Sequence, residues 1–249
     1  MLASSSDLHR DAFFFASGDA TLYGSLVSPP GPVQFGMVVV PSIGPEAAQS
    51  LDPAHALASA AAAWGGAGMV VHPPGSLDST GDAEALTIDA FARAVRDAAG
   101  ALRARVPFLD LCLVGFRFGA AAALLAAGKL EPSLVVALAP TPDPSAAVEE
   151  LRRDSERATF GRGGDAAFGH SVPRSVGGAD APGHIAAAMA RMGSRLVVVR
   201  FTEPPMEGLP AAATDVVVPG TLGRFRIRWA SHLARPAESA IEERMAVRE

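Results

Sequence analysis

The sequence predicts an α/β protein built on a mostly parallel, doubly wound sheet, and two observations support this prediction. Short apolar runs rich in valine recur along the chain without polar alternation, as expected for strands covered on both faces. Helical patterns fall between most of these runs, which is the alternation typical of a doubly wound sheet. With 249 residues, the chain has the length of one large domain. We therefore expect residues 1–249 to form a single α/β domain.

The chain begins with a predicted antiparallel hairpin. Apolar segments at 12–16 and 21–27 are separated by Gly18 and Asp19, which favour a turn. The strands that follow are expected at 35–40, 68–72, 109–114, 134–139, 195–201 and 215–218. Residues 224–229 alternate basic and apolar side chains, which predicts one more, half-buried strand with its arginines facing solvent.

Helices are expected at 53–64, 86–104, 119–128, 183–192 and 236–248. The clearest pattern is 86–104, where apolar residues recur at steps of three and four and form one stripe for the sheet. Residues 141–182 differ, because they are rich in Gly, Ser, Arg and Pro and show only a short helical pattern near 145–158. They lie between two strand candidates, so we expect an insertion or lid over the sheet.

Composition excludes several classes of function. The net charge is -5 and charged residues are scattered, so the overall field does not favour nucleic acid. No run approaches the ~20 apolar residues that span a bilayer, so no membrane-spanning segment is expected. The N-terminal residues lack a basic stretch followed by a long apolar segment, which predicts a cytoplasmic location.

Metal and cofactor sites are not predicted either. The single cysteine, Cys112, sits between leucines and reads as a small buried hydrophobe. The histidines show no spacing or clustering typical of a metal site. No Walker-type loop and no G-x-G-x-x-G after a strand appears, so nucleotide cofactors are not indicated.

The segment most informative about function is CLVGFRFGAAAALLAAG, from Cys112 to Gly128. It combines an apolar strand, a glycine-flanked turn and an alanine-rich helix. Small residues at Gly115 and Gly119 allow strand and helix to approach closely, which is the steric requirement of the hydrolase pattern G-x-S-x-G. Arg117 stands where that pattern has serine.

With these residues in view, the chain resembles the α/β-hydrolase superfamily, in particular its serine aminopeptidase-like branch. Residues 75–82, GSLDSTGD, resemble the segment that follows the fourth strand in that branch, and 38–50, VVVPSIGPEAAQS, resemble the strand and oxyanion loop before it. A further resemblance is to hydrolase-like proteins encoded with exosortase and exopolysaccharide systems. Some of these also have arginine in the elbow and a late segment similar to 177–192, GGADAPGHIAAAMARM.

The resemblance implies positions for a catalytic triad. The nucleophile position falls on Arg117, whose permanently protonated guanidinium cannot attack a carbonyl. The acid position implies Asp143, or Glu203 or Glu207, and His232 is the only histidine beyond the last strand candidate. A carboxylate at the acid position would pair with Arg117 as readily as orient a histidine. Ser79, in DSTGD, is expected to be structural.

The resemblance also implies an oxyanion hole and a ligand site around it. The hole would use the amide of Phe118 and an amide from the loop Ser42, Ile43 and Gly44. Together with Phe116 and Arg117, these residues form the candidate site for a small anionic or acyl ligand. Arg117 would add a positive charge and a fork that suits carboxylate or phosphate.

Two interpretations of the elbow stay open at this stage. It is an anion-binding site, or Arg117 pairs with Asp143 or Glu203 and fills a pocket that has lost its function. Three functions follow: a ligand-binding or accessory protein without serine-hydrolase activity, in an exopolysaccharide or acyl-modification pathway; an ester or thioester hydrolase with an unusual mechanism; or a non-hydrolytic enzyme that uses Arg117 to stabilise an oxyanion.

Overall fold

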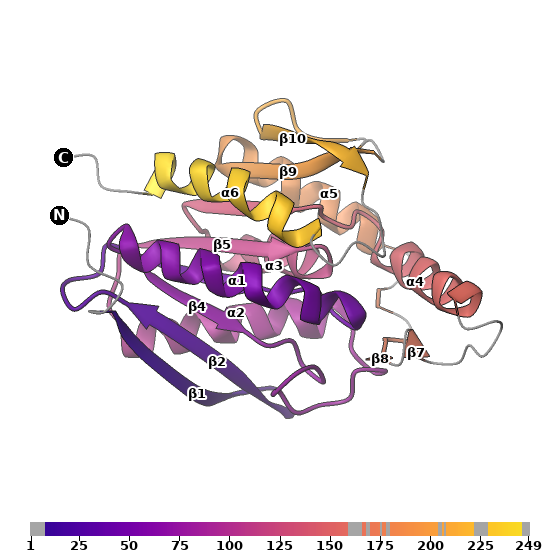
Figure 1. Ribbon diagram of the computed structural model, residues 1–249, viewed down its shortest axis with the longest axis horizontal. Coiled ribbons are helices and arrows are strands. Elements are labelled where there is room, and N and C mark those ends of the chain that lie inside the picture. Colours follow the sequence, from indigo (N-terminus) through magenta and orange to yellow (C-terminus); the bar gives the residue numbers. More distant parts are fainter. Residues whose placement is uncertain are drawn as a thin grey trace.

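The structure is a computed structural model that describes residues 8–158, 166–167, 170–174, 176–177, 180–203, 206, 208–221 and 229–245. An eight-stranded sheet forms its centre, in the order β1-β2-β4-β3-β5-β6-β9-β10 (Figure 1). The hairpin β1 (His9–Ser17) and β2 (Ala20–Ser28) is antiparallel, and β2 also runs antiparallel to β4. All other neighbours in this sheet are parallel.

The parallel strands lie close to their predicted ranges. They are β3 (Phe35–Val40), β4 (Ala67–Val71), β5 (Asp110–Phe116), β6 (Leu134–Leu138), β9 (Leu196–Glu203) and β10 (Thr214–Thr221). Every residue of β3, β4 and β6 is buried, which explains why these strands appear as continuous apolar runs. The predicted α/β class and the mostly parallel sheet with its N-terminal hairpin are confirmed.

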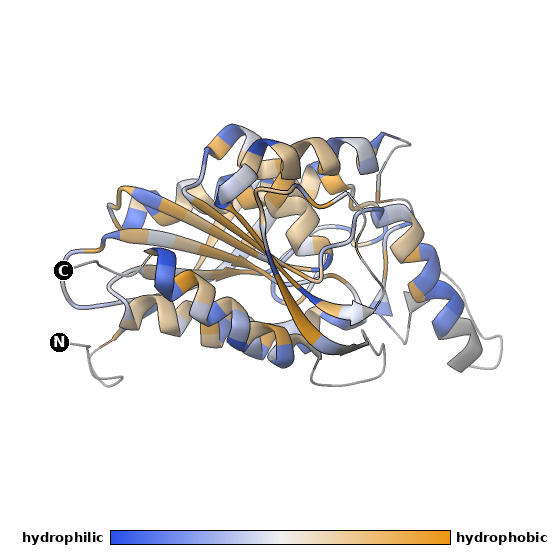
Figure 2. Cartoon of the chain, turned by 90° about the horizontal axis from the view of Figure 1, so that it is seen from above, coloured by the Kyte–Doolittle hydropathy of each residue, from blue (hydrophilic) through white to orange (hydrophobic). Residues whose placement is uncertain are grey.

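Helices cover both faces of the sheet (Figures 1 and 2). The helices α2 (Ile88–Arg105), α3 (Phe118–Leu130) and α5 (Ala181–Met192) pack into one apolar cluster, and α1 (Pro45–Ala63) and α6 (Trp229–Met245) pack into the other. Thr87 caps α2, with its side chain accepting a hydrogen bond from the Ala90 amide. The sheet and the two helix layers therefore form a three-layer α/β/α sandwich.

Two helix predictions started at the wrong residue. The first helix begins at Pro45 rather than 53, because Gly44 turns the chain with φ 57° and Pro45 suits the first helical position; Pro53 lies inside the helix. The last helix begins at Trp229 rather than 236. Trp229 was the end of the strand predicted at 224–229, whose other residues lie outside the described part of the chain.

The segment 141–182 contains α4 (Pro144–Ala158) and a short hairpin of β7 (Ala166–Ala167) and β8 (His170–Ser171). Figure 1 shows α4 and this hairpin beyond one end of the main sheet. Val172, directly after β8, is fully buried and belongs to the same apolar cluster as α2 and α3. The segment 141–182 therefore has helix and strand elements and contacts the core at Val172.

Candidate functional site

The candidate site is built on the turn between β5 and α3. Arg117 occupies the turn with φ 52° and ψ -110°, a region that non-glycine residues rarely adopt. Its amide donates to the Leu138 carbonyl at 2.9 Å, and its own carbonyl accepts from Ala120 and Ala121 at the start of the helix. These bonds hold the residue in a strained turn of the kind that exposes a hydrolase nucleophile.

The glycines of the turn are required by close backbone contact. A Cβ added to Gly119 would lie 2.3 Å from the Val40 carbonyl oxygen, and one added to Gly115 would lie 2.4 Å from the Gly119 carbonyl oxygen. Only glycine therefore lets β3, β5 and α3 meet at this point. The local pattern G-x-R-x-G predicted this geometry.

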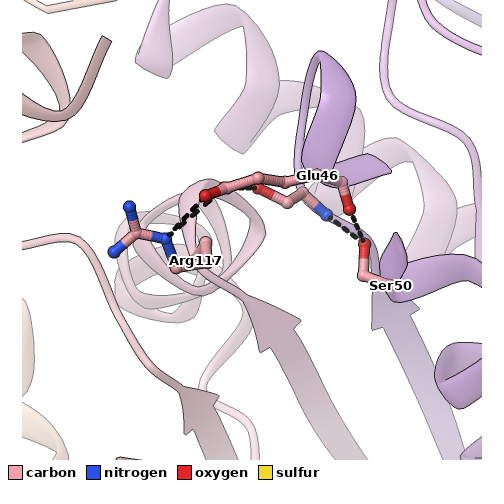
Figure 3. A network of polar contacts seen from close by, with 4 residues as sticks. Glu46, Ser50 and Arg117 are labelled. Atoms are coloured by element: carbon pink, nitrogen blue, oxygen red, sulfur yellow. Dashed lines mark hydrogen bonds and ion pairs between the residues drawn. The ribbon is translucent and has the colours of Figure 1, made fainter. Parts of the chain in front are cut away.

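The Arg117 side chain is paired with Glu46, in the first turn of α1. Its Nε donates to Glu46 Oε1 at 3.2 Å and to Oε2 at 3.4 Å, and the two side chains are only 12% and 10% exposed (Figure 3). Glu46 was missed from the sequence. The available signal was a carboxylate two residues after Gly44, in the loop that the resemblance places beside the elbow.

Two serines fix the Glu46 carboxylate and the loop before it. Ser42 Oγ donates to Glu46 Oε2 at 2.9 Å, and the Ser42 amide donates to Ser50 Oγ at 3.0 Å. Ser50 Oγ in turn donates to the Glu46 carbonyl at 2.8 Å (Figure 3). Both serines are fully buried. The network holds Glu46 in one position from which it orients the guanidinium.

The terminal nitrogens of Arg117 are not used by this network. Within the described part of the chain, neither Nη1 nor Nη2 donates to a protein acceptor, and Figure 3 shows both directed away from Glu46. They carry four N–H donors in a planar fork, which matches the two oxygens of a carboxylate. Glu46 thus orients Arg117 through Nε, and the Nη1 and Nη2 donors have no acceptor among the described residues.

Of the amides considered for the oxyanion hole, those of Ile43, Gly44 and Phe118 are without a partner among the described residues. Phe118 is the first residue of α3, so its amide has no acceptor within the helix. The Ser42 amide, by contrast, is committed to Ser50. Of the three loop amides considered from the sequence, that of Ile43 therefore fits an oxyanion hole better than that of Ser42.

The electrostatics of this edge favour electronegative ligand atoms. The N-termini of α1 and α3 meet here, each with the partial positive charge of a helix dipole, and Arg117 adds a full one. Glu46 is the carboxylate in contact with Arg117 in the described structure. The site therefore stays positive enough to hold a carboxylate or a polarised carbonyl oxygen.

The predicted acid and base are not brought to Arg117. Asp143 is exposed and caps α4, where its Oδ1 accepts from the Ala146 amide at 3.0 Å. His232 is exposed in the first turns of α6 and has no hydrogen bond to a carboxylate among the described residues. Glu203 ends β9, but its side chain, like residue 207, lies outside the described part. Of the two carboxylates weighed as partners of Arg117, Asp143 has no contact with it in the described structure, where Arg117 pairs with Glu46; the pairing with Glu203 stays a prediction.

A small cavity of about 270 Å³ adjoins the oxyanion loop. Its lining comes from the start of α1, the loop after β4 and the strand β8: Gly44, Ala47, Ala48, Gly75, Ser76, Leu77, His170 and Ser171. Val172 closes on the loop so tightly that a Cβ on Gly44 would lie 2.8 Å from its Cγ1. The segment 141–182 thus contributes one wall of a cavity beside the start of α1.

The segment DSTGD is structural, as its resemblance implied. Ser79 Oγ donates to the His72 carbonyl at 2.8 Å and accepts from the Tyr23 amide at 3.0 Å, which ties this loop to the hairpin. Burial lowers the pKa of His72 to about 4, although Asp78 acts in the opposite direction. His72 is therefore neutral at pH 7, with Nδ1 accepting from the Asp78 amide.

Other chemistry is not indicated in the part of the chain that the structure describes. No group of three or more His, Cys, Asp or Glu side chains there has metal-binding geometry. Cys112 is fully buried, and burial raises its thiol pKa far above the usual value, so it is not a nucleophile at neutral pH. None of the described helices is long and apolar enough to cross a membrane.

Comparison with known proteins finds similarity in structure only. No protein-family model matches the chain, and no curated protein sequence does. Among solved structures, XC6422 from Xanthomonas campestris, described as an α/β serine hydrolase without a lid, is 18% identical with a TM-score of 0.60, over 94% of this chain and 93% of that one. The α/β hydrolase GrgF from Penicillium sp. sh18 is 15% identical with a TM-score of 0.66, over 96% and 100%.

Est1E from Butyrivibrio proteoclasticus, determined with ferulic acid bound, is 16% identical with a TM-score of 0.61. The alignment covers 93% of this chain and 97% of Est1E. These identities show the fold and not the activity. The sheet order, the strained elbow and these structural matches together establish that the chain has the α/β-hydrolase fold.

Proposed function

We propose that this protein binds a small anionic or acyl ligand at the elbow and is not an active serine hydrolase. The proposal rests on a difference between the nitrogens of the Arg117 guanidinium. Nε donates to Glu46, whereas Nη1 and Nη2 have no acceptor among the described residues. An arginine that only filled a lost pocket would direct its whole fork at protein acceptors.

A serine-hydrolase mechanism is not supported by the groups present. The acyl-enzyme route needs a nucleophile beside a general base, and Arg117 is neither. His232 is exposed and Asp143 caps a helix, so the alternative of a base-activated water using these two residues also lacks its geometry. Among the described residues, no nucleophile with a general base beside it lies at Arg117, although the elbow has a strained turn.

The chemistry of the site favours a carboxylate or an acyl oxygen as the bound group. One ligand oxygen would lie on the Arg117 fork and another near the amides of Ile43 and Phe118. Est1E holds ferulic acid, a carboxylic acid, on the same fold. Because Glu46 already offsets one positive charge, we expect monocarboxylates to bind better than multiply charged anions.

The wider role that we propose is an accessory function in an exopolysaccharide or acyl-modification pathway. This part of the proposal rests on the resemblance of GFRFG and residues 177–192 to exosortase-associated hydrolase-like proteins of the serine aminopeptidase-like branch. Such an accessory role fits a protein that binds an acyl group without cleaving it.

Thermal shift with acetate, benzoate and ferulate tests the ligand proposal. These ligands should raise the Tm of the wild type in a saturable way and leave the Tm of Arg117→Ala unchanged. Arg103→Ala, an exposed arginine on α2, is the control and should respond like the wild type. Equal shifts in wild type and Arg117→Ala would refute the site.

Labelling with a fluorophosphonate probe tests the catalytic half of the proposal. The wild type should not be labelled and should not turn over p-nitrophenyl or thioester substrates. A covalent adduct on any serine, or turnover that is lost in His232→Ala, would show an active hydrolase.

A second candidate function is a non-hydrolytic enzyme that stabilises an oxyanion, and the amides of Ile43 and Phe118, which have no acceptor among the described residues, favour it. Such an enzyme would polarise a carbonyl through Arg117 for elimination or cyclisation. Slow conversion of a bound acyl compound without release of its acid, absent in Arg117→Ala, would distinguish it from a binding protein.

A further inference from the structure

A basic cleft lies on the helical face formed by α2, α3 and α5, away from the elbow. Its volume is about 410 Å³, within the range of small-molecule sites. Its lining residues are Asp89, Ala92, Arg93, Arg96, Leu125, Lys129, His184, Ala187 and Arg191. We call this set the α2–α3–α5 cleft. Figure 1 shows these three helices on the face of the sheet opposite α1 and α6.

The spacing of the lining residues shows that each helix presents one face to the cleft. On α2 they recur at steps of three and four from Asp89 to Arg96, on α3 they are four apart, and on α5 they run from His184 to Arg191 at steps of three and four. The small side chains of Ala92 and Ala187 lie in the middle of these faces and leave space between the longer side chains. The basic ends of long side chains therefore border one shared space.

The charge of the cleft is opposite to that of the chain. Arg93, Arg96, Lys129 and Arg191 line it with a single carboxylate, Asp89, whereas the whole protein carries -5. Within the described part of the chain, none of the four basic side chains has an ion-pair partner within 4.0 Å. In the described lining, the four basic side chains therefore face one carboxylate, that of Asp89, and the cleft keeps an excess of positive charge.

The cleft is separate from the candidate site at Arg117. Lys129 lies in the last turn of α3, and Arg117 precedes the first, so the two are roughly 18 Å apart along the helix at 1.5 Å per residue. A ligand bound in the cleft would not contact the elbow. The two sites can therefore be tested independently.

We propose that the α2–α3–α5 cleft binds a small molecule that carries a pyrophosphate group or two neighbouring phosphates. The forks of Arg96 and Arg191 and the Lys129 ammonium group match several phosphate oxygens at once, whereas a monocarboxylate would neutralise only one of them; the Arg93 guanidinium adds positive charge at the edge, where it lies near Gly18. The cleft holds no Phe, Tyr or Trp side chain for base stacking. This composition and the acidic net charge favour a compact polyanion over a nucleic acid strand.

Protection of Lys129 from acylation tests the proposal directly, because Lys129 is the only lysine of the chain and is exposed. The full-length protein is treated with an amine-reactive ester in low salt, with and without inorganic pyrophosphate, and the modified peptides are quantified by mass spectrometry. We expect pyrophosphate to slow acylation of Lys129 several-fold and acetate to have no effect. The N-terminal amine is the internal control and should react equally in all samples.

Calorimetric titration with pyrophosphate gives the second measurement. The variants Arg96→Gln and Arg191→Gln should each weaken binding about tenfold, as expected for the loss of one charge-assisted contact. Arg103→Gln removes the same charge from α2 outside the cleft and should change affinity less than twofold, and Arg117→Ala should leave it unchanged. If Arg117→Ala were the only variant that weakened pyrophosphate binding, pyrophosphate would bind at the elbow and the proposal would be overturned.

Three further results would contradict the proposed pyrophosphate site. These are no saturable pyrophosphate binding, equal affinity in Arg96→Gln and Arg103→Gln, or protection of Lys129 by a short single-stranded oligonucleotide but not by pyrophosphate. Because monocarboxylates probe the elbow and pyrophosphate probes the cleft, failure of one site leaves the other intact.

Discussion

Arg117 Nε and Glu46 Oε1 lie 3.2 Å apart, although the two residues are separated by 71 positions in the sequence. The contact links the turn after β5 to the first turn of α1. Both groups are nearly buried, so each depends on the other for its charge to be compensated. The Glu46 carboxylate, and not Asp143, contacts Arg117 in the described structure, and it does so through Nε alone.

We expect the pair to be strongly coupled in stability. Glu46→Ala should lower the free energy of unfolding by about 3 kcal/mol, because it leaves the Arg117 charge buried without a partner. Arg117→Ala should cost a similar amount, and the double variant should cost less than the sum of the two. Urea unfolding of all four proteins gives the coupling energy; a value near zero would mean that the pair is screened by solvent.

The glycines of the elbow should not tolerate a methyl group. Gly115→Ala and Gly119→Ala should each reduce the free energy of unfolding by about 2–3 kcal/mol, because the new Cβ would lie within 2.4 Å of a carbonyl oxygen. Gly100→Ala is the matched control. It lies in α2 with nothing within 4 Å of an added Cβ, so it should raise stability by about 0.5–1 kcal/mol. Equal changes in the free energy of unfolding at all three positions would contradict the close backbone contacts at Gly115 and Gly119.

Restoring serine at the elbow should not restore a hydrolase. Arg117→Ser would put a hydroxyl on the strained turn, but no His–carboxylate pair lies beside it in the described part of the chain. We expect no labelling by a fluorophosphonate and no turnover of p-nitrophenyl acetate above buffer. An active α/β-hydrolase treated in parallel is the positive control. A rapid acyl adduct at position 117 would reveal a base that the structure does not place there.

Stability should fall on acidification partly through His72. Burial lowers its pKa from the usual 6.5 to about 4 in the folded protein, so the unfolded state binds the proton first. The contribution is complete above pH 6.5 and is lost progressively as the pH falls toward 4. Urea unfolding between pH 7.5 and 4.5 should show a smaller loss in His72→Gln than in the wild type. Parallel pH profiles would mean that His72 titrates alike in both states.

The local features of the fold were predictable because they depend on neighbours in the chain. Valine-rich runs identified the strands, and Gly115 and Gly119 identified the elbow, since strand burial and turn sterics act within a few residues. The early start of α1 was missed because Pro53 resembles a helix start, although Gly44 and Pro45 supply a stronger one. The alternating residues of 224–228 lie outside the described part, so their strand stays a prediction.

The sequence by itself determined the alternation of strands and helices of an α/β fold and the tight strand–turn–helix around Arg117, because both follow from residue type and local spacing. The α/β-hydrolase-like architecture was implied by the resemblance of these segments to that superfamily. The tertiary structure decided which carboxylate meets Arg117, which loop amides are committed elsewhere, and that four basic side chains from three helices border one cleft. These facts depend on how helices far apart in the sequence are set against the sheet, and side-chain packing across the whole domain fixes that arrangement.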